Sequence, residues 1–225
     1  STTLCRSLGF VHEVIYSFAE TYGRRLVSLR LIGHELEELP AEVGENCLSL
    51  TSLSLAANRF AALPDSLCNL TKLVDMNLLR NQITRLPDDI GDLVELRNLL
   101  IASNRLESLP ATFGNLTNLK RVVLECNKLA RMPETLSRMT CHTLNLNANE
   151  LVSLPHCIKS MASLQTLSAN ENLLRQLPRD LGESTSLTSI HAVSNRISEL
   201  PDSMGNMTGL RSLWLDHNNM TSLPW

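Results

Sequence analysis

The stretch from Leu96 to Asn118 reads LRNLLIASNRLESLPATFGNLTN, and its spacing decides the fold. Leucine or isoleucine stands at its first, fourth, sixth, eleventh and fourteenth positions. The segment from Leu99 to Ile101 alternates with period two, which indicates a short strand with one face buried. One such stretch cannot bury these side chains alone, so it predicts neighbouring copies that share a continuous core.

The same unit recurs nine times along the chain. All nine prolines follow Leu or Met, at spacings of 24, 23, 23, 23, 22, 23, 23 and 23 residues. The unequal spacings fall near the end of a unit, so the connecting segment changes length and the strand does not. The copies begin at Leu26, Leu50, Leu73, Leu96, Leu119, Cys141, Leu164, Leu187 and Leu210.

Each recurring residue predicts a local structure. Stacked copies align their strands as a parallel sheet, with neighbours about 4.8 Å apart. An Asn, or His34 in the first copy, stands six residues before each proline. Its amide is expected to bond backbone groups at the bend and in the next coil. Proline fixes φ where the chain turns back, and the short return leg predicts turns or single 3-10 pieces on the convex side.

This pattern resembles the 23-residue leucine-rich repeats of intracellular scaffold proteins, such as the Ras-suppressor and Scribble-like families. The resemblance extends from Leu26 to Trp225. It implies an α/β fold, a right-handed solenoid with its parallel sheet on the concave face. It also implies small GTPases and phosphatases as the first partner classes to test. The departures from the pattern are His34, Cys141, Ala169 and Ala192.

The two ends of the chain differ. Residues 1–25 are predicted to form an N-terminal capping helix that covers the first coil, and Gly23 is a plausible stop. Residues 26–225 form the repeat domain of nine copies, the last one truncated at Trp225. Either a longer polypeptide continues there or another chain covers this edge. The apolar residues at helical spacing in the first segment are Leu8, Val11, Val14, Ile15, Phe18 and Tyr22.

Composition excludes several classes of function. The net charge of −3 gives no electrostatic reason to expect nucleic acid or a membrane surface as the main partner. No apolar run approaches the roughly 20 residues of a membrane span. The cysteines are scattered, which favours reduced thiols and a cytoplasmic location. Four N-x-T sequons would instead imply secretion if glycosylated; they lie at Asn69, Asn115, Asn206 and Asn219.

No pattern in the chain indicates catalysis, a cofactor or a metal site. The nucleotide-binding, serine-hydrolase and zinc-protease motifs are all missing from the sequence. Cys141 and His142 are adjacent, and adjacent residues of a strand face opposite ways. His156 and Cys157 lie on a return leg, and no second His–Cys pair occurs at the same position of another copy. We therefore expect a non-enzymatic protein.

Function is predicted to lie on the concave face, at the third, fifth and seventh residues of each copy. An apolar patch with a charged rim is typical of protein interfaces, although scattered exposed aliphatics are also normal on any surface. The patch and rim predicted to bind a partner are Leu79, Arg80, Leu100, Ala102, Arg121, Val123 and Glu125. Arg105, Lys128 and Asp75 also surround this patch.

A second candidate group lies near the C-terminus and contains His191, Trp214 and Asp216. Trp is enriched at binding hot spots, but Trp214 could equally pack against a cap. Asn145, Asn147, Ser168 and Asn170 form a polar strip between the two groups. Together these residues predict a protein-binding module in signalling or scaffolding. The alternatives are a structural subunit of a large assembly and the targeting arm of a longer multidomain protein.

Overall fold

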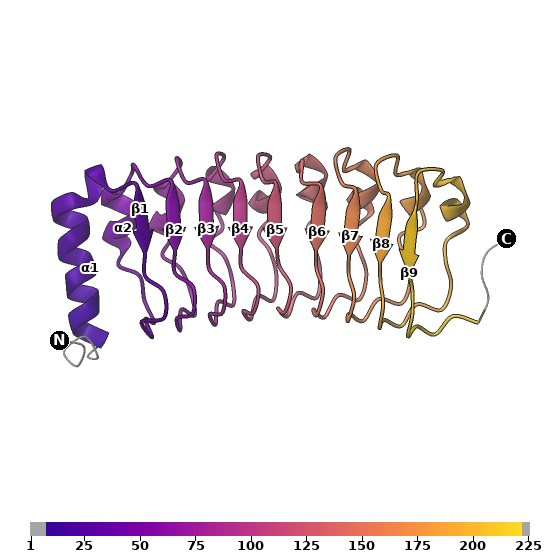
Figure 1. The fold of residues 1–225 in the computed structure, drawn as a ribbon, viewed down its shortest axis with the longest axis horizontal. Helices are drawn as coiled ribbons and strands as arrows, with labels where there is room; N and C mark the ends of the chain where they lie inside the picture. Colours follow the sequence, from indigo (N-terminus) through magenta and orange to yellow (C-terminus); the bar gives the residue numbers. More distant parts are fainter. Residues whose placement is uncertain (1–7, 222–225) are drawn as a thin grey trace.

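The computed structural model describes residues 8–221, and these form a solenoid of stacked coils (Figure 1). Each coil contributes one short strand, and the nine described strands form a single parallel sheet in chain order. The strands are β1 Ser28–Arg30, β2 Ser52–Ser54, β3 Asp75–Asn77, β4 Asn98–Leu100, β5 Arg121–Val123, β6 Thr143–Asn145, β7 Thr166–Ser168, β8 Ser189–His191 and β9 Ser212–Trp214.

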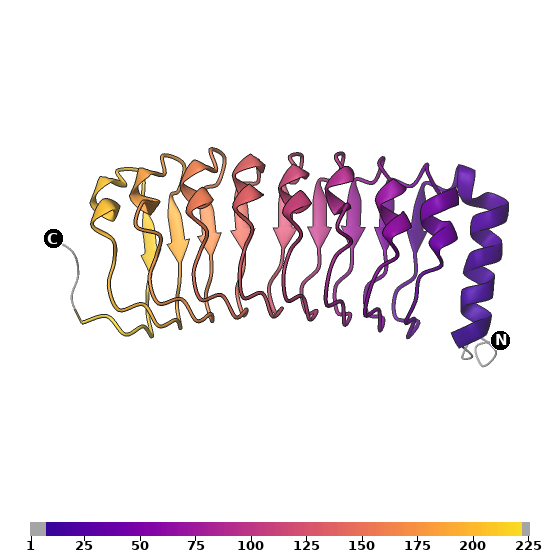
Figure 2. The same cartoon turned by 180° about the vertical axis from the view of Figure 1, so that it is seen from behind.

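The return legs form the opposite layer of the solenoid, as the view from behind shows (Figure 2). Seven of them carry 3-10 helices, which confirms the expected short pieces. The first copy differs, because its extra residue accommodates the α-helix α2, Ala41–Asn46. The 3-10 helices of these legs are η3 Asp65–Asn69, η4 Ile90–Asp92, η5 Ala111–Asn115, η6 Glu134–Arg138, η7 His156–Ser160, η8 Leu181–Glu183 and η9 Asp202–Asn206.

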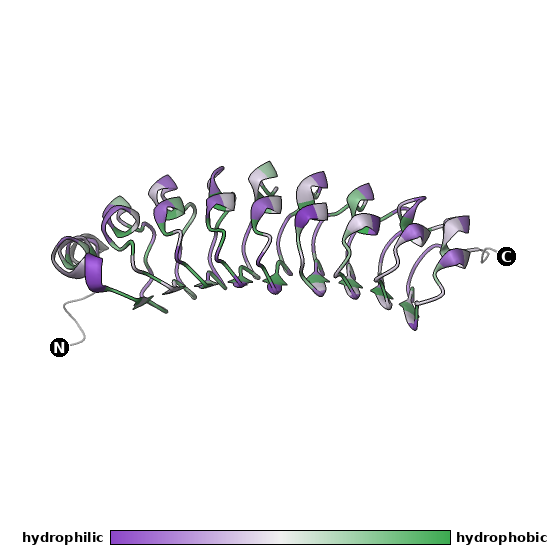
Figure 3. Cartoon of the chain, turned by 90° about the horizontal axis from the view of Figure 1, so that it is seen from above, coloured by the Kyte–Doolittle hydropathy of each residue, from purple (hydrophilic) through white to green (hydrophobic). Residues whose placement is uncertain are grey.

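Seen from above, the sheet lies on the inner side of the curve and the helical pieces on the outer side (Figure 3). The recurring aliphatic residues fill the space between the two layers. In the fourth copy Leu96, Leu99, Ile101 and Leu106 are all completely buried. Burial of such a side chain stabilises the fold by roughly 1.5–3 kcal/mol. The core is therefore one cluster of mostly leucine side chains that continues from coil to coil.

The recurring Asn residues join each coil to the one before it. The Nδ2 of Asn104 donates to the carbonyl oxygens of Leu78 and Ile101, at 2.9 and 3.0 Å. Its Oδ1 accepts the N–H of Ile83 at 3.0 Å. The expectation that this amide reaches the next coil is wrong, because the side chain points toward the preceding one. No coil precedes the first, and His34 there is exposed.

The capping helix α1, Leu8–Tyr22, packs against the first coil and ends before Gly23, as the sequence predicted. Among residues 12–22 of this helix, Ile15 and Ala19 are buried, and Asn46 donates to Glu20 at 3.0 Å. The predicted apolar face is only partly correct, because Val14, Phe18 and Tyr22 are exposed. The buried side chains Ile15 and Ala19 form a narrow stripe, and the neighbouring flank of the helix is uncovered.

Two predictions fall outside the described residues. The side chains of Leu8 and Val11 are not among those described, and the truncated end at Leu223, Pro224 and Trp225 lies beyond residue 221. Within the described part, no helix is long and apolar enough to cross a membrane.

Candidate protein-binding face

The strand register determines which side chains reach the concave face. Leu99 and Leu124 are completely buried, whereas Leu100 and Val123 are only half-buried and Trp214 is 54% exposed. Side chains on a strand alternate between the two faces of the sheet. The third, fifth and seventh positions of each copy therefore face outward, as the sequence predicted.

An apolar patch lies on three neighbouring coils of this face. Leu100 of β4 pairs in register with Val123 of β5, and Leu79 follows the end of β3. All three side chains are half-buried. Ala102 is a correction, because only 3% of it is exposed. Its methyl group is shorter than the side chains at the same position in the adjacent coils, so it lies beneath the surface and the patch consists of Leu79, Leu100 and Val123.

Charged side chains border this patch as predicted. Arg80 and Arg121 are exposed, and neither forms an ion pair within the described residues. Arg80 has a φ of 54°, and the corresponding residues of the other coils from the second to the ninth have φ values between 51° and 55°, because the backbone bends sharply after each strand. Glu125 is half-buried and its Oε2 accepts a hydrogen bond from Asn145 Nδ2 at 2.7 Å. The rim is thus asymmetric: Arg80 and Arg121 have no ion-pair partner among the described residues, whereas the carboxylate of Glu125 accepts a hydrogen bond from an amide.

The second candidate group forms an aromatic platform. His191 and Trp214 are register partners in β8 and β9, and their rings stack with centroids 4.1 Å apart. Ser168 Oγ lies 3.3 Å from His191 Nδ1, which holds the imidazole toward β7. Asp216 is exposed beside the platform. The structure therefore places Trp214 on the concave face, where it offers a flat apolar surface.

Burial makes the cysteines poor nucleophiles. It raises the pKa of Cys141 to about 11 and the pKa of Cys68 to about 12. Cys141 is buried while His142 is exposed, which confirms that the pair faces opposite ways. Cys126 is the exposed thiol of the described part. No group of three or more potential metal ligands occurs there either.

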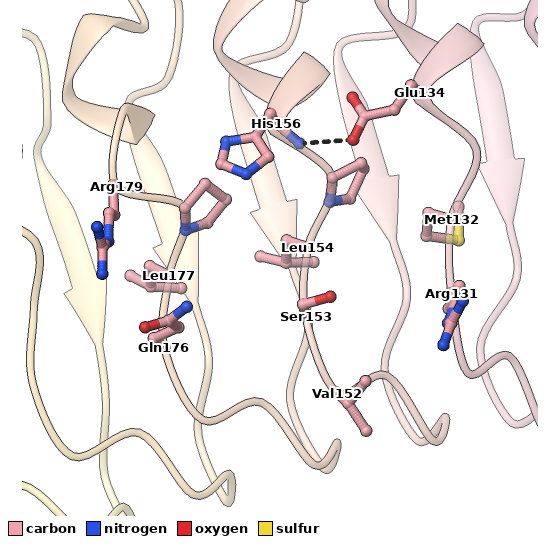
Figure 4. Close-up of a pocket in the computed structure, with 12 residues that line it drawn as sticks. Arg131, Met132, Glu134, Val152, Ser153, Leu154, His156, Gln176, Leu177 and Arg179 are labelled. Atoms are coloured by element: carbon pink, nitrogen blue, oxygen red, sulfur yellow. Dashed lines mark hydrogen bonds between the residues drawn. The ribbon is translucent and has the colours of Figure 1, made fainter.

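A groove on the flank of the solenoid was missed by the sequence analysis (Figure 4). It crosses the proline segments of three consecutive coils, between Arg131 and Arg179. Glu134 accepts hydrogen bonds from the backbone N–H groups of His156 and Cys157, at 3.1 and 2.9 Å. The residues come from different coils, so no local motif could have revealed the groove.

An ion cluster lies beside the groove. Lys159 Nζ is 2.9 Å from Asp180 and 2.7 Å from Glu183, and His156 Nδ1 is 3.0 Å from Asp180. Hydrogen bonds from Lys159 and His156 lower the pKa of Asp180 to about 2. These contacts fasten η7 to η8 and involve ordinary surface charges. We assign them a structural role.

Comparison with known proteins agrees with this architecture. Residues 48–106 match the family model described as leucine rich repeat. The fold is that of a leucine-rich-repeat solenoid. Domains of this kind generally mediate protein binding and are typically non-catalytic. A search of curated proteins gives no significant match to this leucine-rich-repeat chain.

Solved structures provide further likenesses to the leucine-rich-repeat chain. The ectodomain of the Arabidopsis thaliana receptor kinase GASSHO1/SCHENGEN3, in complex with Casparian strip integrity factor 2, is 31% identical over 88% of this chain, with a TM-score of 0.75. The Yersinia pestis effector YopM is 27% identical over 94%, with a TM-score of 0.70. A leucine-rich-repeat protein of Leptospira interrogans is 24% identical over 93%, with a TM-score of 0.76, and shows the fold alone. The chain spans 24%, 55% and 59% of these three proteins, respectively.

Proposed function

We propose that this protein is a non-enzymatic interaction module that holds a protein partner on its concave face. One observation carries the proposal: Leu79, Leu100 and Val123 form a contiguous apolar patch on three adjacent coils of the concave face, bordered by exposed arginines. Contiguous apolar patches with a polar rim are characteristic of interaction sites. The complex recorded for the Arabidopsis ectodomain supports a binding role, although that protein is far longer.

The finer role that we propose is signalling or scaffolding in the cytoplasm. The cysteines are scattered, and those within residues 8–221 are unpaired, which supports an intracellular site. The 23-residue repeat supports kinship with the intracellular scaffold type. Small GTPases and phosphatases are the first partner classes to test on that resemblance.

The test compares two double variants of the full-length protein. Leu79→Glu with Leu100→Glu places charges in the patch, so we expect binding to captured partners to weaken about tenfold or more. The matched control, Val94→Glu with Val152→Glu, changes two exposed aliphatics outside the concave face. Affinity purification from the native source, followed by mass spectrometry, measures capture. Equal capture by both variants would refute the concave-face proposal.

One observation favours a second candidate, a subunit held in a larger assembly. The flank of α1 exposes Val14, Phe18 and Tyr22, which are spaced at four residues along one side of the helix. Permanent interfaces are larger and more apolar than transient ones. If this flank is such an interface, Phe18→Glu releases the protein from its complex in size-exclusion chromatography with light scattering. An unchanged complex would argue against this candidate.

A further inference from the structure

The polar strip beside the apolar patch presents hydrogen-bond donors. Asn147 Oδ1 accepts the backbone N–H of Asn170 at 2.8 Å, and Asn170 Oδ1 accepts that of Val193 at 2.8 Å. Because a backbone N–H only donates, each amide turns its oxygen toward the next coil and leaves its NH₂ group accessible to solvent. Neither Nδ2 group has a hydrogen-bond partner within the described residues. The strip therefore offers donors whose orientation is fixed.

These two donors lie side by side. Asn145 of β6 pairs with Ser168 of β7, and Asn147 and Asn170 each follow two residues later. Adjacent strands are about 4.8 Å apart. Glu125, Glu150 and Glu171 lie on the same or neighbouring coils, so this position suits neutral carbonyl oxygens better than a carboxylate.

Two basic rows flank the apolar patch. Arg97, Lys120 and Arg121 are exposed where β4 and β5 begin, and Arg80, Arg105 and Lys128 are exposed beyond the strand ends. None of the six forms an ion pair within the described residues. The nearby carboxylates of Asp75 and Glu125 each accept a hydrogen bond from an Asn amide. The rim around the apolar patch is therefore basic although the whole chain carries −3.

We infer that the concave face takes an extended acidic segment of a partner protein, a deepening that rests on the function proposed above. An aliphatic side chain of the segment packs on Leu79, Leu100 and Val123, and its carboxylates face the basic rows. Its backbone carbonyl groups accept from Asn147 and Asn170. An extended chain fits because its carbonyl groups are free, whereas a helix satisfies most of its own.

Three labelled twelve-residue peptides serve as probes against the full-length chain in fluorescence polarisation. One alternates Glu and Leu, one alternates Lys and Leu, and one alternates Glu and Ser. We expect the Glu/Leu peptide to bind most tightly, since it alone has both charge and aliphatic complementarity, and its affinity to fall as salt screens the charges. Tighter binding of either other peptide overturns the inference.

Charge reversal tests the basic rows. Arg97→Glu with Lys120→Glu and Arg121→Glu should weaken Glu/Leu peptide binding about tenfold or more. The matched control reverses three exposed arginines of the return legs, Arg85, Arg131 and Arg175. An equal loss in both triple variants would mean that only net charge matters, which overturns the inference.

The donor pair has its own variant. Asn147→Asp with Asn170→Asp keeps both acceptor oxygens for the backbone but removes both outward donors. Binding of the Glu/Leu peptide should fall further than in Thr143→Asp with Thr166→Asp, which adds the same two charges on β6 and β7 but leaves both amide donors in place. An equal or smaller fall overturns the assignment of the donors.

Two outcomes separate this inference from the proposed function. If no probe peptide binds but partner capture still depends on Leu79 and Leu100, the chemistry of the segment is wrong and the interaction module stands. If the Leu79→Glu with Leu100→Glu variant captures partners as well as the unmodified protein does, the proposed function fails as well. A single-stranded oligonucleotide that binds more tightly than the Glu/Leu peptide would overturn the inference in favour of nucleic acid.

Discussion

At the scale of single residues, close contact between neighbouring coils depends on positions where glycine, which has no Cβ, lets two backbone segments approach. Glycine recurs four residues after the proline in five copies. A Cβ on Gly114 would overlap the carbonyl oxygen of Thr135 in the next coil, whereas a Cβ on Gly205 would meet no atom within 4 Å. The same repeat position is therefore constrained in one coil and free in another.

We expect Gly114→Ala to lower the free energy of unfolding by about 1–3 kcal/mol, because the coils must move apart to admit the methyl group. Urea denaturation measures the change. Gly205→Ala is the matched control, and its effect should stay within about 1 kcal/mol, since alanine also favours the helical backbone. Equal losses in the two variants would contradict the contact shown for Gly114.

At the scale of elements, each return leg or cap is secured by contacts with its neighbour along the solenoid. The capping helix α1 reaches the first coil through Ile15 and Ala19, while Phe18 remains 42% exposed. Farther along, Lys159 and His156 of η7 bind Asp180 at the start of η8. These contacts predict how substitutions and pH affect the two regions.

For the cap, Ala19→Glu should destabilise the protein by about 1–3 kcal/mol, because a charge would be buried without a partner. Phe18→Glu, one residue away, should cost much less, since that side chain already contacts solvent. Thermal unfolding followed by circular dichroism measures both variants. A larger effect of Phe18→Glu would mean that the opposite side of α1 faces the solenoid.

For the ion cluster, the folded-state pKa of Asp180, about 2, lies below its ordinary value of about 3.9. Its ion pairs therefore stabilise the fold above about pH 4, and this contribution is lost as the pH falls toward 2. Asp180→Asn should lower the unfolding temperature at neutral pH. Between pH 4 and 2, the unfolding temperature of this variant should fall less than that of the wild type.

The control for this titration is Asp89→Asn, at the same position of an earlier copy and without an ion pair in the described part of the chain. We expect Asp89→Asn to leave unchanged the slope of the unfolding temperature against pH between pH 4 and 2. Differential scanning calorimetry across the acid range gives both curves. Identical slopes for the wild type and Asp180→Asn would contradict the role assigned to these ion pairs.

At the scale of the whole molecule, stability depends on coils that each contact only their neighbours. The fourth residue of the copy is completely buried at Leu99, between coils on both sides, but 37% exposed at Leu213 in the ninth coil. Identical residues at identical repeat positions thus contribute differently according to what lies beside them.

We expect Leu99→Ala to cost about 2–5 kcal/mol, because it removes buried methyl groups and leaves a cavity. Leu213→Ala should cost less than about 1.5 kcal/mol, since its side chain already contacts water. Urea denaturation read by circular dichroism compares the two. Similar costs would show that the ninth coil is packed as tightly as the fourth.

The sequence by itself determined the coil, the strand register and the inside–outside pattern, because these follow from a period that recurs nine times. It also predicted α1 and its end before Gly23. Only the tertiary structure decided that Ala102 is covered, that the flank of α1 stays open, and that Asn147 and Asn170 turn their donors outward. Those features depend on the sizes and hydrogen bonds of variable side chains about 23 residues apart, which a repeat pattern leaves unspecified.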